Sequence, residues 1–113
     1  MKLLRAVIRP EREDQVIQAL ESAGIVSLTK RDVLGRGQQR GIQLGATVYD
    51  ELPKVELMVV VEDAQLDAAL SAIAAGAKTG QPGDGKVFVS PVETAYTIRT
   101  GHKSTESPHV PPR

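Results

Sequence analysis

The 113-residue sequence has no cysteine and no tryptophan, and only three other aromatic residues. Without cysteine, the chain has no disulfide framework, no thiolate nucleophile and no cysteine metal site. The two histidines, His102 and His109, lie near the C-terminus without the spacing of a metal site. A chain of this length buries only about two-thirds of its unfolded surface, and few large side chains are present to fill the core. We therefore expect a homo-oligomer in which another subunit completes the core.

A surplus of charge of either sign is also missing, because 14 basic residues balance 14 acidic ones. A protein that binds the phosphate backbone of nucleic acid needs a basic surplus, and RNA binding on a sheet face needs exposed aromatic residues. We therefore expect no nucleic-acid partner. The N-terminal stretch MKLLRAVIRP contains no long apolar run, so neither a signal peptide nor a membrane insertion is predicted. A single cytoplasmic domain is expected.

Short apolar segments alternate with helical patterns along the chain. Strands are predicted at 2–8, 25–33, 55–61 and 87–89, with a last extended piece at 93–99. Helical spacing predicts one helix that begins near Pro10 and ends at Gly24, and a second that begins near residue 62 and ends at Gly76. The order β-α-β-β-α-β is typical of the α+β ferredoxin-like fold. Its antiparallel sheet has helices on one face only, which again favours association of subunits.

Two segments fall outside this regular pattern. Residues 36–52, between the second and third strands, form a polar loop with glycines inside it, and Pro53 is expected to close it. This loop is far longer than a hairpin needs, and loops of such length are usually functional or disordered. The tail 102–113 is polar and rich in proline, so it is predicted to be disordered. The folded domain is expected to comprise residues 1–101.

The segment 79–86 (TGQPGDGK), here called the glycine-rich loop, leads directly into Val87-Phe88-Val89. Its three glycines and one proline exclude a helix interior or a central strand. Backbone N–H groups that converge in such a loop can bind an anion, above all phosphate. A tight helix-to-strand connection without any ligand has the same composition. Because the loop enters a strand and not a helix, it lacks the arrangement of the Walker phosphate loop.

Four blocks of sequence share the pattern of one known family. They are Gly35-Arg36-Gly37 with Gln39 and Gly41, Leu52-Pro53-Lys54, the segment 79–89, and Ile98-Arg99-Thr100-Gly101. Together they resemble the PII nitrogen-regulatory signal-transduction family over nearly the whole folded chain. The resemblance implies a trimer of ferredoxin-like units that binds ATP or ADP in clefts between subunits, and 2-oxoglutarate together with MgATP. It also implies that the 36–52 loop, here called the effector loop, docks on or releases a partner protein.

The resemblance assigns ligands to particular residues. Lys54 would pair with the distal carboxylate of 2-oxoglutarate, and Gln39 would meet both 2-oxoglutarate and Mg²⁺ through its side-chain oxygen. Arg99 would reach the nucleotide of the neighbouring subunit. The residues expected to bind nucleotide are Thr29, Gly35, Arg36, Gly37, Gln38, Gly83, Asp84, Gly85, Lys86 and Arg99. Outside the family, these side chains would be taken for ordinary surface or strand residues.

Three positions depart from the common family pattern. Gln38 stands where most members carry a basic residue, Thr97 stands where many have a second arginine, and Met58 replaces a frequent glutamate. The two missing cations remove hydrogen bonds to charged groups, which are worth about 1.5–3 kcal/mol each. Nucleotide affinity, or the preference between ATP and ADP, is therefore expected to differ. The effector loop is also shorter than in common bacterial members, and covalent modification of Tyr49 is not expected.

Longer strings, including Asp32-Val33, residues 49–54, Val60-Val61-Glu62-Asp63 and residues 90–101, resemble the nitrogenase-associated branch of the family. Members of that branch act with a sister paralogue and inhibit dinitrogenase when 2-oxoglutarate is low. Control of an ammonium transporter is the alternative, which the lack of Arg and Lys in residues 41–50 disfavours. A nucleotide-hydrolysing enzyme is a third hypothesis. No His, Cys or Ser constellation suggests a nucleophile, so we expect a regulator and not an enzyme.

Overall fold

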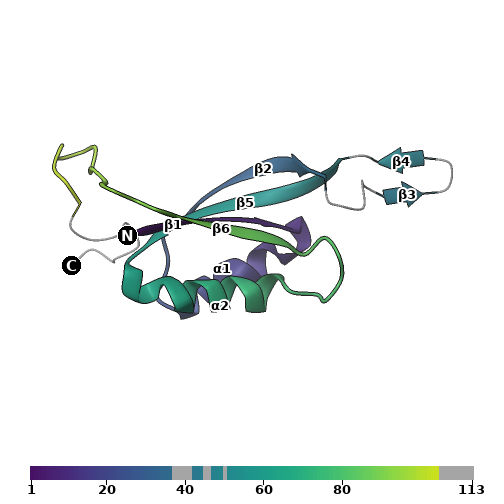
Figure 1. Ribbon diagram of the computed structural model, residues 1–113, viewed down its shortest axis with the longest axis horizontal. Helices are drawn as coiled ribbons and strands as arrows, with labels where there is room; N and C mark the ends of the chain where they lie inside the picture. Colours follow the sequence, from purple (N-terminus) through teal and green to yellow (C-terminus); the bar gives the residue numbers. More distant parts are fainter. Residues whose placement is uncertain (37–41, 45–46, 50, 105–113) are drawn as a thin grey trace.

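The computed structural model describes residues 1–36, 42–44, 47–49 and 51–104. Its main sheet contains β1 (Lys2–Ile8), β2 (Thr29–Gly35), β5 (Leu52–Val61) and β6 (Gly85–Pro91). These strands pair antiparallel in the order β2-β5-β1-β6. The helices α1 (Glu13–Ser22) and α2 (Leu66–Ala77) lie on one face of the sheet (Figure 1). The 3-10 turns η1 (Pro10–Arg12) and η2 (Asp63–Gln65) precede them. The predicted ferredoxin-like fold is confirmed.

The core lies between the helices and one face of the sheet. Alternate residues of β1 and β5 face it, because side chains alternate across a strand. The buried residues from these two strands are Leu4, Ala6, Ile8, Val55, Leu57, Val59 and Val61. Val16 and Leu20 of α1 and Ile73 of α2 meet them from the other side. In the part of the chain that the structure describes, the opposite face of the sheet carries no helix (Figure 1).

Gly76 lies inside α2, although the sequence predicted that it ends the helix. The helix continues to Ala77. A Cβ atom at Gly76 would lie 2.7 Å from Val16 Cα, so the glycine is needed where the backbones of the two helices approach each other. Gly24, in contrast, has a φ of +84° just beyond α1 and ends that helix as predicted.

The second strand lies later in the chain than expected. It was predicted at 25–33, but β2 covers Thr29–Gly35, and Ile25 is a buried core residue ahead of it. Pro53 does not close a loop but pairs with Leu34 inside β5. The β1 strand ends opposite Val55, so β5 has only one neighbour at Pro53. Because that side of β5 is unpaired, a proline, which has no backbone N–H to donate, is tolerated there.

The effector loop contains a hairpin that the sequence did not predict. Strand β3 (Ile42–Leu44) pairs antiparallel with β4 (Thr47–Tyr49). The hairpin lies beyond the ends of β2 and β5 (Figure 1). Three-residue strands are too short to give a periodic sequence signal.

The chain after β6 folds back on itself where a single extended piece was predicted at 93–99. Tyr96 and Lys103 form an antiparallel bridge, and the backbone N–H of Ser104 donates to the Ala95 carbonyl at 2.7 Å. This turn, residues 93–104, is here called the C-terminal arm. It lies at the end of the sheet opposite the glycine-rich loop (Figure 1). The described chain thus stays folded slightly past residue 101. The disordered tail stays a prediction, because residues 105–113 lie outside the described residues.

No helix in the described part of the chain is long and apolar enough to cross a membrane.

Candidate functional site

Two glycines give the glycine-rich loop its path from α2 into β6. Gly83 and Gly85 have φ angles of +100° and +110°, a region that residues with a Cβ rarely adopt. A Cβ atom at Gly85 would also lie only 1.8 Å from the Val7 carbonyl oxygen. The loop therefore rests directly on the end of β1, and no other residue fits at position 85.

Asp84 closes the glycine-rich loop from within. Its Oδ2 atom accepts hydrogen bonds from the Thr79 N–H at 2.8 Å and the Gly80 N–H at 2.9 Å. Its Oδ1 atom accepts from the Thr79 hydroxyl and from Arg9 Nε. These bonds, that of the Thr79 hydroxyl first, hold the pKa of the Asp84 carboxyl well below its usual range. Both oxygens are thus engaged in shaping the loop, and the predicted contact of Asp84 with nucleotide stays a prediction.

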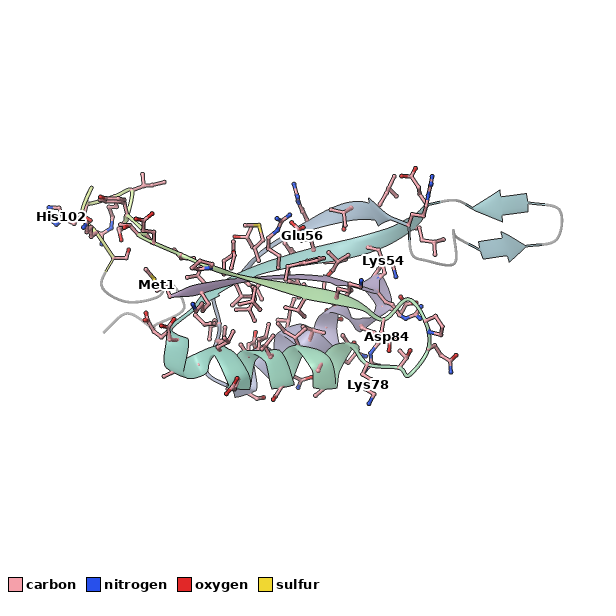
Figure 2. The ribbon with its side chains drawn as sticks, in the orientation of Figure 1. Met1, Lys54, Glu56, Lys78, Asp84 and His102 are labelled. Carbon is pink, nitrogen blue, oxygen red and sulfur yellow. The ribbon has the colours of Figure 1, made fainter. Side chains whose placement is uncertain are left out.

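Two cations hold successive carbonyls of the same loop. Lys54 Nζ donates to the Gly83 carbonyl at 2.7 Å, and Arg9 Nη2 donates to the Pro82 carbonyl at 2.6 Å. Burial, together with the charge of Arg9, lowers the pKa of the Lys54 ammonium. Lys54 and Asp84 lie at the same end of the sheet (Figure 2). The fold thus joins Lys54, predicted to bind 2-oxoglutarate, to the loop predicted to bind phosphate.

Arg9 was missed by the sequence analysis. It stands between β1 and Pro10 of η1. An arginine at the end of a strand is usually exposed to solvent. Its Nε lies 3.2 Å from Asp84 Oδ1, and the two side chains are only 25% and 24% exposed. No local pattern pairs residues 9 and 84. The antiparallel pairing of Ile8 with Gly85 is what brings them together.

The end of β2 completes this side of the site. A Cβ atom at Gly35 would lie 3.2 Å from the Lys54 side-chain Cγ, so the glycine leaves room for the lysine stem. Arg36 follows at once and is exposed. An open hollow beside Lys54 is lined by Pro10, Asp32, Val33, Leu34 and Pro53. Gly37, Gln38 and Gln39 lie outside the described residues.

Two predicted residues, Thr29 and Arg99, lie away from this cluster within one subunit. Thr29 pairs with Met58, four residues along β5 from Lys54, a separation of about 13 Å. Lys86 pairs with Val7 and shares the helix-free face of the sheet with Lys54. Arg99 follows β6, whose own length is about 20 Å, so it lies at the far end of the sheet. Figure 2 shows the neighbouring His102 at that end.

The helix-free face of the sheet contains a charged cluster that the sequence analysis also missed. Glu56 is 5% exposed, and it accepts hydrogen bonds from Arg5 at 3.0 Å and Arg31 at 2.9 Å. The Arg5 hydrogen bond is the main cause of the lowered pKa of the Glu56 carboxyl. Because Met58 and Phe88 border this cluster on the same face, the face combines apolar area with surplus positive charge.

The donors on this end of the sheet suit an anion. Lys54 and Arg9 carry positive charge beside the glycine-rich loop, and the backbone N–H groups of such a loop are further donors. No group of three or more His, Cys, Asp or Glu side chains that could hold a metal occurs in the described ranges. The Mg²⁺ ligand that the resemblance implies, Gln39, lies outside those ranges.

Comparison with known proteins gives consistent matches. The family model described as "Nitrogen regulatory protein P-II" matches residues 1–102. "Nitrogen fixation nifHD1 region GlnB-like protein 1" of Methanosarcina barkeri is 54% identical over 101 residues, covering 89% of this chain and 96% of the relative. "Nitrogen fixation nifHD region GlnB-like protein 1" of Methanothermobacter marburgensis is 50% identical, covering 88% and 95%. "Nitrogen regulatory protein P-II" of Microchaete diplosiphon is 44% identical, covering 95% and 99%.

Proposed function

Because the chain belongs to the nitrogen regulatory protein P-II family, we propose that it senses adenine nucleotide and 2-oxoglutarate and transmits their binding to a partner through its effector loop. The observation that carries this proposal is the 2.7 Å hydrogen bond from Lys54 to the Gly83 carbonyl. It ties the residue proposed to bind 2-oxoglutarate to the loop proposed to bind phosphates. An anion that takes the lysine ammonium therefore acts on both.

Lys54 also lies where a ligand can act on the effector loop. It is two residues beyond the end of that loop, near the start of β5, where it pairs with Val33 of β2. A carboxylate bound to Lys54 would replace the Gly83 carbonyl as partner of the ammonium, and this shift changes the base of the effector loop. Such a ligand favours one loop conformation only by its difference in affinity for the two. Reciprocity then requires that nucleotide and 2-oxoglutarate tighten each other's binding.

The nucleotide site is proposed to lie between subunits of a trimer. Within one subunit the C-terminal arm, which contains Arg99, and the glycine-rich loop lie at opposite ends of β6 (Figure 1). A second copy would have to supply Arg99, and Thr29 with it, to a nucleotide held by Gly83–Lys86, Gly35 and Arg36. Gly37 and Gln38 would extend this site, and Gln39 would hold Mg²⁺, which neutralises phosphate charge when bound. The helix-free sheet face is the surface available for this association. A paralogue in place of one copy is a variant of the same arrangement.

The partner is proposed to be dinitrogenase. Two of the similar proteins are named from nitrogen-fixation regions, and this favours dinitrogenase over an ammonium transporter. Adding the purified protein to a dinitrogenase activity assay tests this: we expect inhibition with ATP alone and relief when 2-oxoglutarate is added. Activity that ignores the protein under both conditions would contradict this partner, while leaving effector binding intact.

Effector binding is tested by calorimetry with MgATP, with and without saturating 2-oxoglutarate. We expect ATP to bind at least tenfold more tightly with 2-oxoglutarate, a coupling of about 1.4 kcal/mol. Lys54→Gln should abolish the enhancement, and it should also weaken binding of ATP alone because the Gly83 carbonyl loses its partner. Lys78→Gln is the matched control, because this nearby exposed lysine lies outside the proposed contacts. Equal ATP affinity in both titrations of the wild type would refute the coupling.

A further inference from the structure

The glycine-rich loop is held by its carbonyl groups at two successive peptides. Arg9 Nη2 lies 2.6 Å from the Pro82 oxygen, and Lys54 Nζ lies 2.7 Å from the Gly83 oxygen. Arg9 makes a second bond at the same place, from Nε to Asp84 Oδ1 at 3.2 Å. A Cβ atom on Gly83 would lie 3.1 Å from Arg9 Nη2, so the guanidinium lies directly against the loop backbone.

These contacts fix where the loop's N–H groups point. In a planar trans peptide the C=O and N–H groups point in opposite directions. The Pro82 carbonyl shares its peptide with the Gly83 N–H, and this peptide is trans. A guanidinium that binds the carbonyl therefore turns the Gly83 N–H away from itself. Among the described residues, no hydrogen bond from the Gly83 N–H to a protein acceptor is found, and Gly83 is exposed.

We propose that Arg9 is a positioning residue, which holds the glycine-rich loop in the shape that binds the phosphate groups of a nucleotide. This inference rests on the proposed function, namely that the loop binds phosphate. Arg9 acts through the backbone: it binds the Pro82 carbonyl and Asp84, and Asp84 in turn accepts the N–H groups of Thr79 and Gly80. One side chain thereby connects both ends of the loop.

The chemistry requires an arginine and not merely a positive charge. The guanidinium presents several N–H donors in a rigid planar fork, so it can bind a carboxylate and a carbonyl at once. A lysine ammonium is a single point of charge on a flexible stem. The Arg9→Lys variant should therefore still attract an anion, but its glycine-rich loop should no longer be held in shape.

The test combines two measurements on Arg9→Lys, Arg9→Gln and the control Arg12→Gln. Arg12 lies three residues away and carries the same charge, but it donates to the Gly76 carbonyl at the end of α2. Without ligand, we expect hydrogen exchange of the Thr79 and Gly80 amides to become at least tenfold faster in both Arg9 variants and not in the control. With MgATP, we expect affinity to fall about tenfold in both Arg9 variants, the equivalent of one charge-assisted hydrogen bond.

The possible results separate this inference from the proposed function. If both Arg9 variants bind ATP as tightly as the wild type and keep slow amide exchange, the inference is wrong and the proposed function stands. If Arg9→Lys retains full affinity and only Arg9→Gln loses it, Arg9 acts by charge and positioning is refuted. A wild type that does not bind ATP overturns the proposed function itself. Circular dichroism of each variant shows whether it folds, and Arg9→Lys keeps the test available if Arg9→Gln does not.

Discussion

The contact between Gly85 and β1 provides the sharpest test of how the glycine-rich loop is built. A Cβ atom at Gly85 would lie 1.8 Å from the Val7 oxygen, where ordinary contact needs 3.4–4 Å. Gly85→Ala must therefore separate β6 from β1 at the point where their pairing begins. The backbone at this residue also has a φ of +110°, which an alanine adopts only with strain.

The magnitude follows from these two terms. A Cβ in a positive-φ conformation costs about 1–2 kcal/mol, and forcing extra volume into a packed position adds about 1–3 kcal/mol. We expect Gly85→Ala to lower the free energy of unfolding by about 2–5 kcal/mol. Gly80→Ala is the matched control, because Gly80 has a φ of +88° but nothing within 4 Å of its Cβ position. It should lose only the first term, about 1–2 kcal/mol.

Urea denaturation followed by circular dichroism measures both losses. All variants are compared at one protein concentration, because association of subunits adds to apparent stability. The difference between the two alanine variants isolates the contact with the Val7 oxygen. If Gly85→Ala is no less stable than Gly80→Ala, the loop does not rest on β1 as described, and the loop geometry derived from this contact fails.

Three further outcomes are expected. Gly76→Ala should lower the free energy of unfolding by about 1–3 kcal/mol through overpacking against α1, and an unchanged urea midpoint would contradict the close helix approach. Asp84→Asn should remove the stabilisation that the lowered pKa of the Asp84 carboxyl provides. The wild type has this stabilisation in full above the unfolded-state pKa of about 3.9 and loses it as the pH falls. A variant with the same acid-denaturation midpoint as the wild type would refute this role of Asp84. Glu56→Gln should lower the free energy of unfolding at pH 7 by weakening both arginine contacts. This loss of stability should shrink in acid, because the folded-state pKa of Glu56 is lowered and the contribution of its carboxylate is lost as the pH falls. A loss that is independent of pH would count against this role of Glu56.

The sequence was sufficient for the fold where patterns are local. Alternating burial in β1, helical spacing in α1 and the glycine after α1 all produce signals within a few residues, and these elements were predicted correctly. Gly76 was misinterpreted because the sequence alone does not distinguish a glycine that ends a helix from one that makes room for a neighbouring helix. Only the position of Val16 distinguishes the two.

The candidate site was predictable only as far as family resemblance reaches. Lys54 was expected to bind 2-oxoglutarate and the glycine-rich loop to bind phosphate, and the fold brings the two within hydrogen-bond distance. Arg9 and Glu56 were not found, because their partners lie 75 and 51 residues away and depend on strand register. A glutamate within the apolar run 55–61 was the one available signal. A buried carboxylate requires a cation, and the sequence does not say which.

The two ends of β6 carry different structures, which limits how copies of the chain can assemble through them. One end leads from the glycine-rich loop, and the other leads into the C-terminal arm that carries Arg99. A contact in which the arm of one copy meets the loop of the next joins two different patches of the surface. Where the same two molecules do not also make the return contact, such head-to-tail contacts produce a closed ring or an open filament. Any ring built this way has as many complete pockets as members, and removing one member leaves half a pocket on each of its two neighbours.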